Sequence, residues 1–136
     1  MRMKPSISLA DAQPMIAAAR AEAERAGWSV SIAVVDESGV LVAFERMDGA
    51  NPQSPDISRG KAWTAAVTRT PTKALEDVVK DRPATLSFAG RVPVQGGLPI
   101  KVGNDCIGGI GVSGAASKDD EQVAQAGLAA LPPGKP

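Results

Sequence analysis

An apolar stripe at spacings of three and four residues follows Ser8, and this spacing predicts an amphipathic helix near the start of the chain. Ser8 and Asp11 form an imperfect capping box, because Asp stands where Glu or Gln is usual. Gly27 is suited to end the helix, while Pro14 either kinks it or lies in its first turn with Asp11 as the true cap. The stripe consists of Leu9, Ala12, Ile16, Ala19, Ala23 and Ala26.

A run of β-branched residues over 30–36 is apolar at both odd and even positions, which is typical of a central strand covered on both faces. Residues 37–39 form a tight turn that ends in glycine, and residues 40–47 return as the second strand of a hairpin. Because strands joined by tight turns pair antiparallel, the sheet is expected to be antiparallel. Further strands are predicted over 98–102 and 106–112, with a short one around 92–94.

Three more helices complete the pattern. One covers 56–69 with Asp56 as its cap, and the next runs from Thr70, with Pro71 at its first position, to residue 82. The last runs from Ser117 to residue 131, and the acidic residues 119–121 at its start are interpreted as capping groups that also face the helix dipole. This order predicts an α+β sandwich in which helices cover the sheet. A single domain over residues 1–136 is expected, with frayed ends at 1–7 and 132–136.

The composition excludes several classes of function. The 15 Lys and Arg residues balance the 15 Asp and Glu residues, so no general attraction to nucleic acid or to an anionic membrane is expected. The chain has no His and one Cys, which excludes a Ser-His-Asp triad, a Cys-His dyad and a disulfide within the chain. No metal site is expected either. The sequence contains no recognisable signal peptide or membrane-spanning run, and a cytoplasmic location is expected.

Candidate chemistry gathers at the ends of the predicted strands. Arg46 and Asp48 stand where a strand leaves into a loop; Arg46 either clamps a ligand carboxylate or pairs with Glu45 or Asp48 at the surface. Lys61, on the helix that follows, is either a solvated surface lysine or a ligand-binding group. The glycines at 96–97 leave backbone N–H groups able to face a ligand, or they form a plain turn.

The glycine-rich segment 108–114 does not fit a nucleotide-binding loop, because no helix opens directly from it and no Lys-Ser or Lys-Thr pair follows. Glycine inside a strand instead marks a close approach of the backbone to a helix or to a ligand. Cys106 begins the same apolar stretch and is expected to be a buried, inert thiol.

Four blocks of the sequence resemble one known family. They read GWSVSIAVVDESGVLVAFERMDGANPQS, GKAWTAAVTRT, VQGGLPI and GGIGVSGAASKDDEQVAQAGLAAL, and the resemblance extends from Ser8 to Leu131. The family is the GlcG/HbpS or haem-degrading-domain family, which includes the C-terminal domain of PduO-type proteins. The resemblance implies a profilin-like sandwich with a five-stranded antiparallel sheet and helices on both faces. It also implies homo-oligomers from dimers to octamers, for which the second face of the first helix, with Ala17, Ala18 and Ala21, is a candidate contact.

Some members of the family bind haem, and members often carry His in the turn of the first hairpin. This chain has Ser38, Gly39 and Val40 there, so Met47 and Cys106 are the soft ligands left for a haem iron. Haem is therefore a doubtful cofactor for this chain, and its binding is expected to be weak or absent.

Two classes of function remain from this reasoning. We expect a small-molecule-binding protein, an accessory factor for an anionic, aromatic or tetrapyrrole metabolite. The alternative is a His-independent isomerase, hydratase or decarboxylase acting on a small carboxylate or aromatic catabolite, with Asp48 and Lys61 as catalytic candidates; a ligand-free oligomeric scaffold is a third possibility. A site is expected where the strand-end loops converge. Its ligand-binding candidates are Arg46, Asp48, Lys61, Gln95, Gly96, Gly97 and Ser113.

Overall fold

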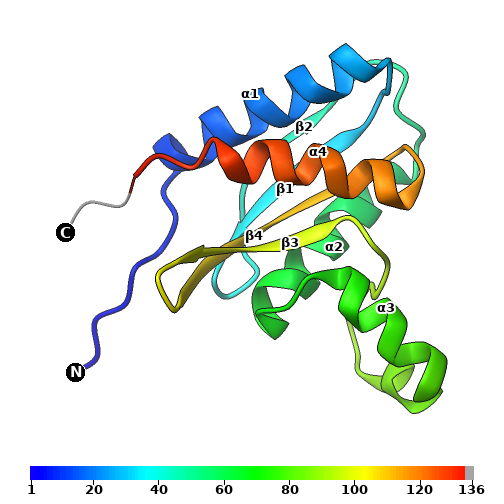
Figure 1. Cartoon of the computed structure of the whole chain (residues 1–136). Helices are drawn as coiled ribbons and strands as arrows, with labels where there is room; N and C mark the ends of the chain where they lie inside the picture. The colour runs from blue at the N-terminus through cyan, green and yellow to red at the C-terminus, as the bar shows by residue number, and fades with distance from the viewer. Residues whose placement is uncertain (134–136) are drawn as a thin grey trace.

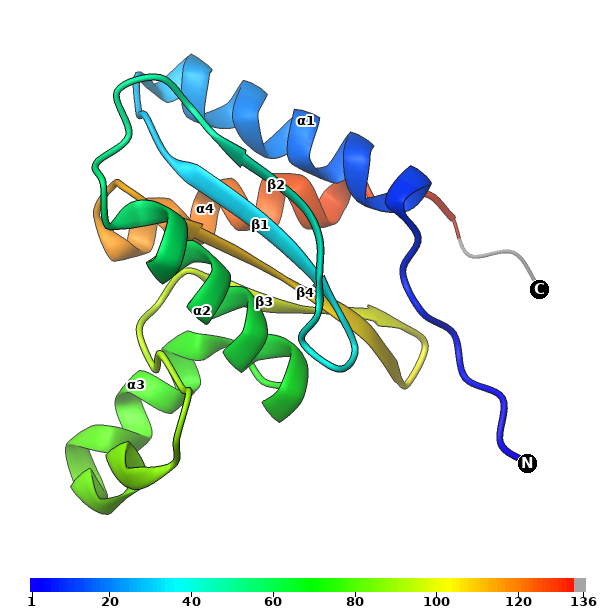
Figure 2. The ribbon, with the colours of Figure 1, turned by 180° about the vertical axis from the view of Figure 1, so that it is seen from behind.

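Four antiparallel strands form the sheet at the centre of the protein, in the order β2-β1-β4-β3 (Figure 1). The structure is a computed structural model and describes residues 1–133. The helices α1 and α4 cover one face of the sheet and α2 covers the other (Figure 2). The strands are β1 (Ser31–Asp36), β2 (Leu41–Arg46), β3 (Gly97–Val102) and β4 (Asp105–Ser113).

The expected α+β sandwich with helices on both faces is confirmed, but the expectation of five strands is wrong for the part of the chain that the structure describes. The short strand predicted around 92–94 is a loop. Its backbone bonds do not reach the sheet: Val92 N–H donates to the Thr64 hydroxyl at 2.8 Å, and Val94 N–H donates to Val92 O at 2.9 Å. Pro93 between them has no N–H to offer a neighbouring strand.

The helices begin and end close to their predicted bounds. Ser8 caps the first helix in a complete capping box with Asp11, and Gly27 ends it in the left-handed conformation at φ 81°. The helix continues past Pro14, so Asp11 is not its true cap. Asp56 does not cap the second helix, which begins two residues earlier. The helices are α1 (Leu9–Ala26), α2 (Ser54–Thr68), α3 (Thr72–Asp81) and α4 (Ser117–Ala129), with a 3-10 turn η1 (Pro83–Ser87) after α3. Within residues 1–133, no helix combines the length and apolar character needed to span a membrane.

The strand β1 is buried on both faces, as its continuous apolar run predicted. Ile32 and Val34 face the core under α1 and α4, while Ala33 and Val35 face α2. The layer between the sheet and α2 is thin because its residues are small. A Cβ added at Gly111 would lie 2.1 Å from Ser58 O, so this glycine allows the α2 backbone to lie directly against β4. Of the two interpretations of the glycine-rich strand, close approach to a helix is therefore confirmed.

Candidate functional site

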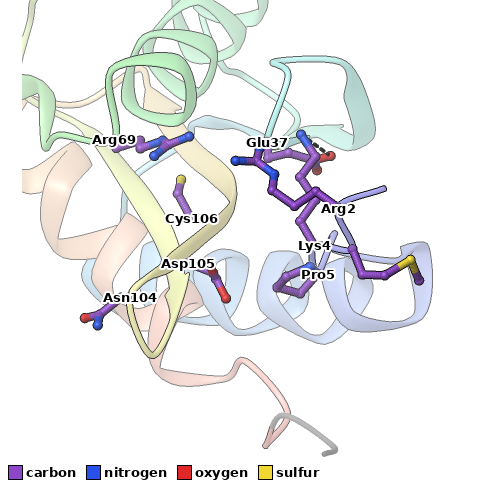
Figure 3. Close-up of a pocket in the computed structure, with 9 residues that line it drawn as sticks. Arg2, Lys4, Pro5, Glu37, Arg69, Asn104, Asp105 and Cys106 are labelled. Atoms are coloured by element: carbon purple, nitrogen blue, oxygen red, sulfur yellow. Dashed lines mark ion pairs between the residues drawn. The ribbon is translucent and has the colours of Figure 1, made fainter.

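A pocket with a volume of about 160 Å³ opens at the end of the sheet where both hairpins turn (Figure 3). We call it the hairpin pocket. Four separate segments of the chain form its wall: the N-terminal residues, the β1–β2 turn, the end of α2 and the β3–β4 turn. The lining residues are Arg2, Met3, Lys4, Pro5, Glu37, Arg69, Asn104, Asp105 and Cys106.

Local backbone conformation positions two of these four segments, each of which forms one wall of the pocket. Arg69 ends α2 in the left-handed conformation at φ 55°, and its N–H bonds back to Ala65 O and Ala66 O. The β1–β2 turn is held by the Asp36 carboxylate, which accepts the N–H groups of Ser38 at 2.9 Å and Val40 at 3.0 Å. This Asx-type turn presents Glu37 beside the end of α2.

The third wall is the N-terminal strap, residues 2–6, which lies over the hairpin ends. Its anchor is Ile7, which is 5% exposed and donates its N–H to Ile107 O at 3.2 Å. Two strap side chains then meet Glu37: the Ser6 hydroxyl donates to Oε2 at 2.6 Å, and Lys4 Nζ lies 3.8 Å from Oε1. The sequence predicted a frayed segment over 1–7, but at Ile7 the chain is buried and bonded to β4.

The charges in the hairpin pocket favour an anion. Three cations line it, Arg2, Lys4 and Arg69, against the carboxylates of Glu37 and Asp105. Within residues 1–133, neither arginine makes an ion pair, and the one ion pair in the pocket is Lys4–Glu37. In Figure 3 the two guanidinium groups point into the same space, while the Asp105 carboxylate points away from them.

The single cysteine lies in the same pocket. Cys106 is half-buried, and its Sγ lies 3.3 Å from Gly108 O and 3.7 Å from Ala66 O. Figure 3 shows this sulfur beneath the Arg69 side chain. Cys106 does not belong to a metal site: among the described residues 1–133, no group of three or more His, Cys, Asp or Glu side chains could hold a metal ion.

Lys61 lies elsewhere, inside the protein. Its side chain is 2% exposed, so the interpretation as a solvated surface lysine is wrong. Its Nζ donates to Val112 O at 2.9 Å and to Asp120 Oδ2 at 3.1 Å, and Asp120 Oδ1 accepts the Ala115 N–H at 2.9 Å. Burial raises the pKa of the Asp120 carboxyl above its usual value, against the opposing effects of Lys61 and the Ala115 N–H. Asp120 was interpreted as a capping residue, but the structure makes it the counter-ion of a buried lysine.

Four other predicted site residues belong to the two segments beside this buried ion pair, residues 95–97 and the end of β4. Gly96 lies so close that an added Cβ would be 2.8 Å from Lys61 Nζ. Gly97 N–H, one of the predicted ligand donors, donates to Thr72 Oγ1 at 2.9 Å. The N–H of Gln95 donates to Glu76 Oε1 at 3.2 Å, and Ser113, 7% exposed, ends β4 opposite Ser31.

Arg46 and Asp48 lie in a different place from Lys61. Both are exposed and line an open groove of about 410 Å³ between α1 and the end of β2, together with Arg20, Glu24 and Glu45. Within residues 1–133 no hydrogen bond or ion pair joins either residue to Lys61. Neither of the predicted Arg46 pairs, with Glu45 or with Asp48, forms among these residues, and Glu45 pairs with Arg20 instead. The structure therefore divides the predicted site into a buried half and an exposed half.

Sequence reasoning missed the hairpin pocket. Its cations come from the N-terminal residues, expected to be frayed, and from Arg69, which the sequence placed only as the last residue of the helix 56–69. A basic residue at the predicted end of a helix, followed by a helix-stopping Pro, is the one signal that could have drawn attention to this wall.

Comparison with known proteins supplies the relatives of this chain. Residues 7–129 match the family model described as haem degrading protein HbpS-like. Protein GlcG of Escherichia coli (strain K12) is 42% identical over 114 residues, covering 83% of this chain and 85% of GlcG. A double mutant of HbpS from Streptomyces reticuli matches with TM-score 0.92 and 38% identity, covering 97% of this chain and 91% of that chain. A PduOC complex with haem matches with TM-score 0.86 and 29% identity, covering 95% of this chain and 97% of that chain.

Proposed function

Because this chain belongs to the HbpS-like family, in which a solved relative holds haem, we propose that it is a small-molecule-binding protein whose ligand is a small carboxylate bound in the hairpin pocket. The observation that carries this proposal is the pair of arginines, Arg2 and Arg69, which face one pocket without a partner of their own within residues 1–133. A guanidinium group binds a carboxylate through two parallel N–H···O bonds, which gives both affinity and orientation.

The size of the pocket limits which carboxylates can be its ligand. An apolar cavity of about 150 Å³ is enough to hold benzene. The hairpin pocket, at about 160 Å³, therefore suits a short hydroxy acid or an acid with a single ring. Its lining is mostly polar, so the carboxylate and any hydroxyl group of the ligand are expected to be hydrogen-bonded, with Asn104 as a further polar group in the wall.

The hairpin pocket does not fit a haem. The macrocycle is several times larger than benzene, and the pocket volume of about 160 Å³ does not accommodate it within one chain. The sequence has no His or Tyr, so Met47 and Cys106 are the candidate axial ligands that remain. Met47 faces the separate groove beside α1, and the Cys106 sulfur is close to two backbone carbonyl oxygens.

Calorimetric titration with sodium benzoate and sodium lactate tests this proposal. We expect saturable binding to the native protein, and a loss of about tenfold or more in affinity in Arg69→Gln and in Arg2→Gln, because each removes one charge-assisted contact. Arg82→Gln is the matched control, since Arg82 is exposed at the end of α3 and lies outside the pocket.

The same titration separates the two candidate locations. If Arg46→Gln loses the binding and Arg69→Gln keeps it, the ligand lies in the groove beside α1 that holds the predicted residues Arg46 and Asp48, and the hairpin pocket is not the site. If no acid binds the native protein at millimolar concentration, the proposal of a carboxylate ligand is wrong.

A further inference from the structure

Within residues 1–133, Glu37 is the one carboxylate that a hydrogen bond or ion pair joins to the N-terminal strap. Its side chain is 17% exposed, and its two oxygens meet two different strap residues, Ser6 at 2.6 Å and Lys4 at 3.8 Å. Among the described residues 1–133, no other side-chain hydrogen bond or ion pair joins the strap to the rest of the protein. Beyond the backbone anchor at Ile7, the position of the strap over the pocket therefore depends on this acidic side chain.

The strap also supplies most of the positive charge in the hairpin pocket. Arg2 and Lys4 belong to it, whereas Arg69 belongs to the fixed wall at the end of α2. The Lys4–Glu37 distance of 3.8 Å is long for a direct hydrogen bond, and Lys4 is 52% exposed. A contact of this kind is weak and easily exchanged for a better partner.

We propose that Glu37 is an internal counter-ion that holds the strap over the hairpin pocket, and that a bound carboxylate takes Lys4 from it. This inference rests on the proposed function, because it assigns the regulation of the same pocket. The Glu37 carboxylate pairs with Lys4, a cation that the ligand needs, and its negative charge also repels the negative charge of the ligand. Glu37 thereby sets the affinity of the pocket and favours ligands with enough negative charge to replace it.

The first test replaces Glu37 by its neutral isostere. Glu37→Gln keeps an oxygen for the Ser6 hydroxyl and removes the competing charge, so benzoate is expected to bind at least about fivefold more tightly than to the native protein. Removing one like charge at close range increases the affinity by a factor of this size even when the dielectric constant is that of water. Glu121→Gln is the matched control, because it makes the same change in net charge on α4, outside the pocket.

The second test asks whether Lys4 changes partner. Lys4→Gln is measured in the native background and in the Glu37→Gln background, which completes a double-mutant cycle. If Lys4 must leave Glu37 to reach the ligand, the loss of Lys4 lowers benzoate affinity more in the Glu37→Gln background than in the native protein. Equal losses in both backgrounds would show that Lys4 does not change partner, and would overturn this inference.

The outcomes separate this inference from the function on which it rests. If Glu37→Gln binds benzoate no better than the native protein while Arg69→Gln loses binding, the counter-ion role is wrong and the pocket remains the site. If benzoate and lactate bind neither the native protein nor Glu37→Gln, both proposals are wrong. Binding that is detected only in Glu37→Gln would support both, since it would show a pocket that its own carboxylate keeps closed.

Discussion

Removing the buried lysine should destabilise the protein strongly, because it leaves a carboxylate inside the protein without its counter-ion. We consider Lys61→Met, which keeps the length and most of the volume of the side chain. The Lys61 and Asp120 side chains are 2% and 3% exposed, and Lys61 Nζ also donates a hydrogen bond to Val112 O. Breaking a buried ion pair by removing one partner typically costs about 3–5 kcal/mol. For a chain of this size that corresponds to a fall in Tm of roughly 10 °C or more.

Equilibrium unfolding in urea, followed by tryptophan fluorescence, measures this loss. The double variant, in which Asp120→Asn is added to Lys61→Met, should recover much of it. The remaining deficit should be about 1–3 kcal/mol, the usual cost of a buried acceptor such as Val112 O left without its donor. The reasoning fails if Lys61→Met loses less than about 1 kcal/mol, or if the double variant is less stable than Lys61→Met alone.

The pH dependence gives an independent check on the same variant. Burial already raises the pKa of Asp120 in the native protein, so the folded state takes up this proton at a higher pH than the unfolded chain does. The contribution of Asp120 to stability therefore increases as pH falls through its raised folded pKa, and it levels off below the unfolded value. Without Lys61 the pKa of Asp120 should rise further, so the deficit of Lys61→Met should shrink between pH 7 and pH 5.

Three further outcomes follow from the structure. Gly111→Ala should cost at least about 2 kcal/mol, since its Cβ would meet the α2 backbone at 2.1 Å, whereas Gly27→Ala should cost only about 1 kcal/mol from its left-handed backbone; urea unfolding compares the two. Hemin titration should give a shallow absorbance change without a sharp one-to-one endpoint, and a tight complex abolished by Cys106→Ala would contradict this. Light scattering at micromolar concentration should show a homo-oligomer, and a species with the mass of a single chain would refute that expectation.

The fold could be predicted from local patterns because most of its elements are specified locally. The helical stripe with Ser8 and Gly27 at its ends defines α1, and the continuous apolar run defines β1 as a strand covered on both faces. The glycines of β4 were also correctly interpreted, since glycine inside an apolar strand marks a close approach of the backbone, here to the helix α2. The number of strands was not predictable in this way, because the Val92 N–H bonds to Thr64 on α2 and the Val94 N–H bonds to Val92 O, so neither bonds to the sheet.

The candidate site was harder to predict because its chemistry depends on residues that are distant in the sequence. Lys61 looks like a surface residue from composition, since lysine is almost never fully buried unless it is paired. Its partner Asp120 lies 59 residues away, and at the start of a helix an aspartate has an ordinary capping role. The hairpin pocket combines the N-terminal residues with two turns and the end of α2, and no local pattern joins these segments.

The two walls of the hairpin pocket differ in how firmly they are held, and this difference determines where affinity can be changed. The helix α2 is fixed along its length: Ser54 Oγ lies 2.8 Å from Ser31 Oγ, Lys61 bonds into the buried pair, and Gly111 brings its backbone against β4. Arg69 at its end is therefore positioned by the core. The strap on the other side is held by side-chain contacts to Glu37 and by the single anchor at Ile7. Substitutions in the core under α2 should change stability first and binding only through it, whereas substitutions in the strap should change binding with little effect on stability.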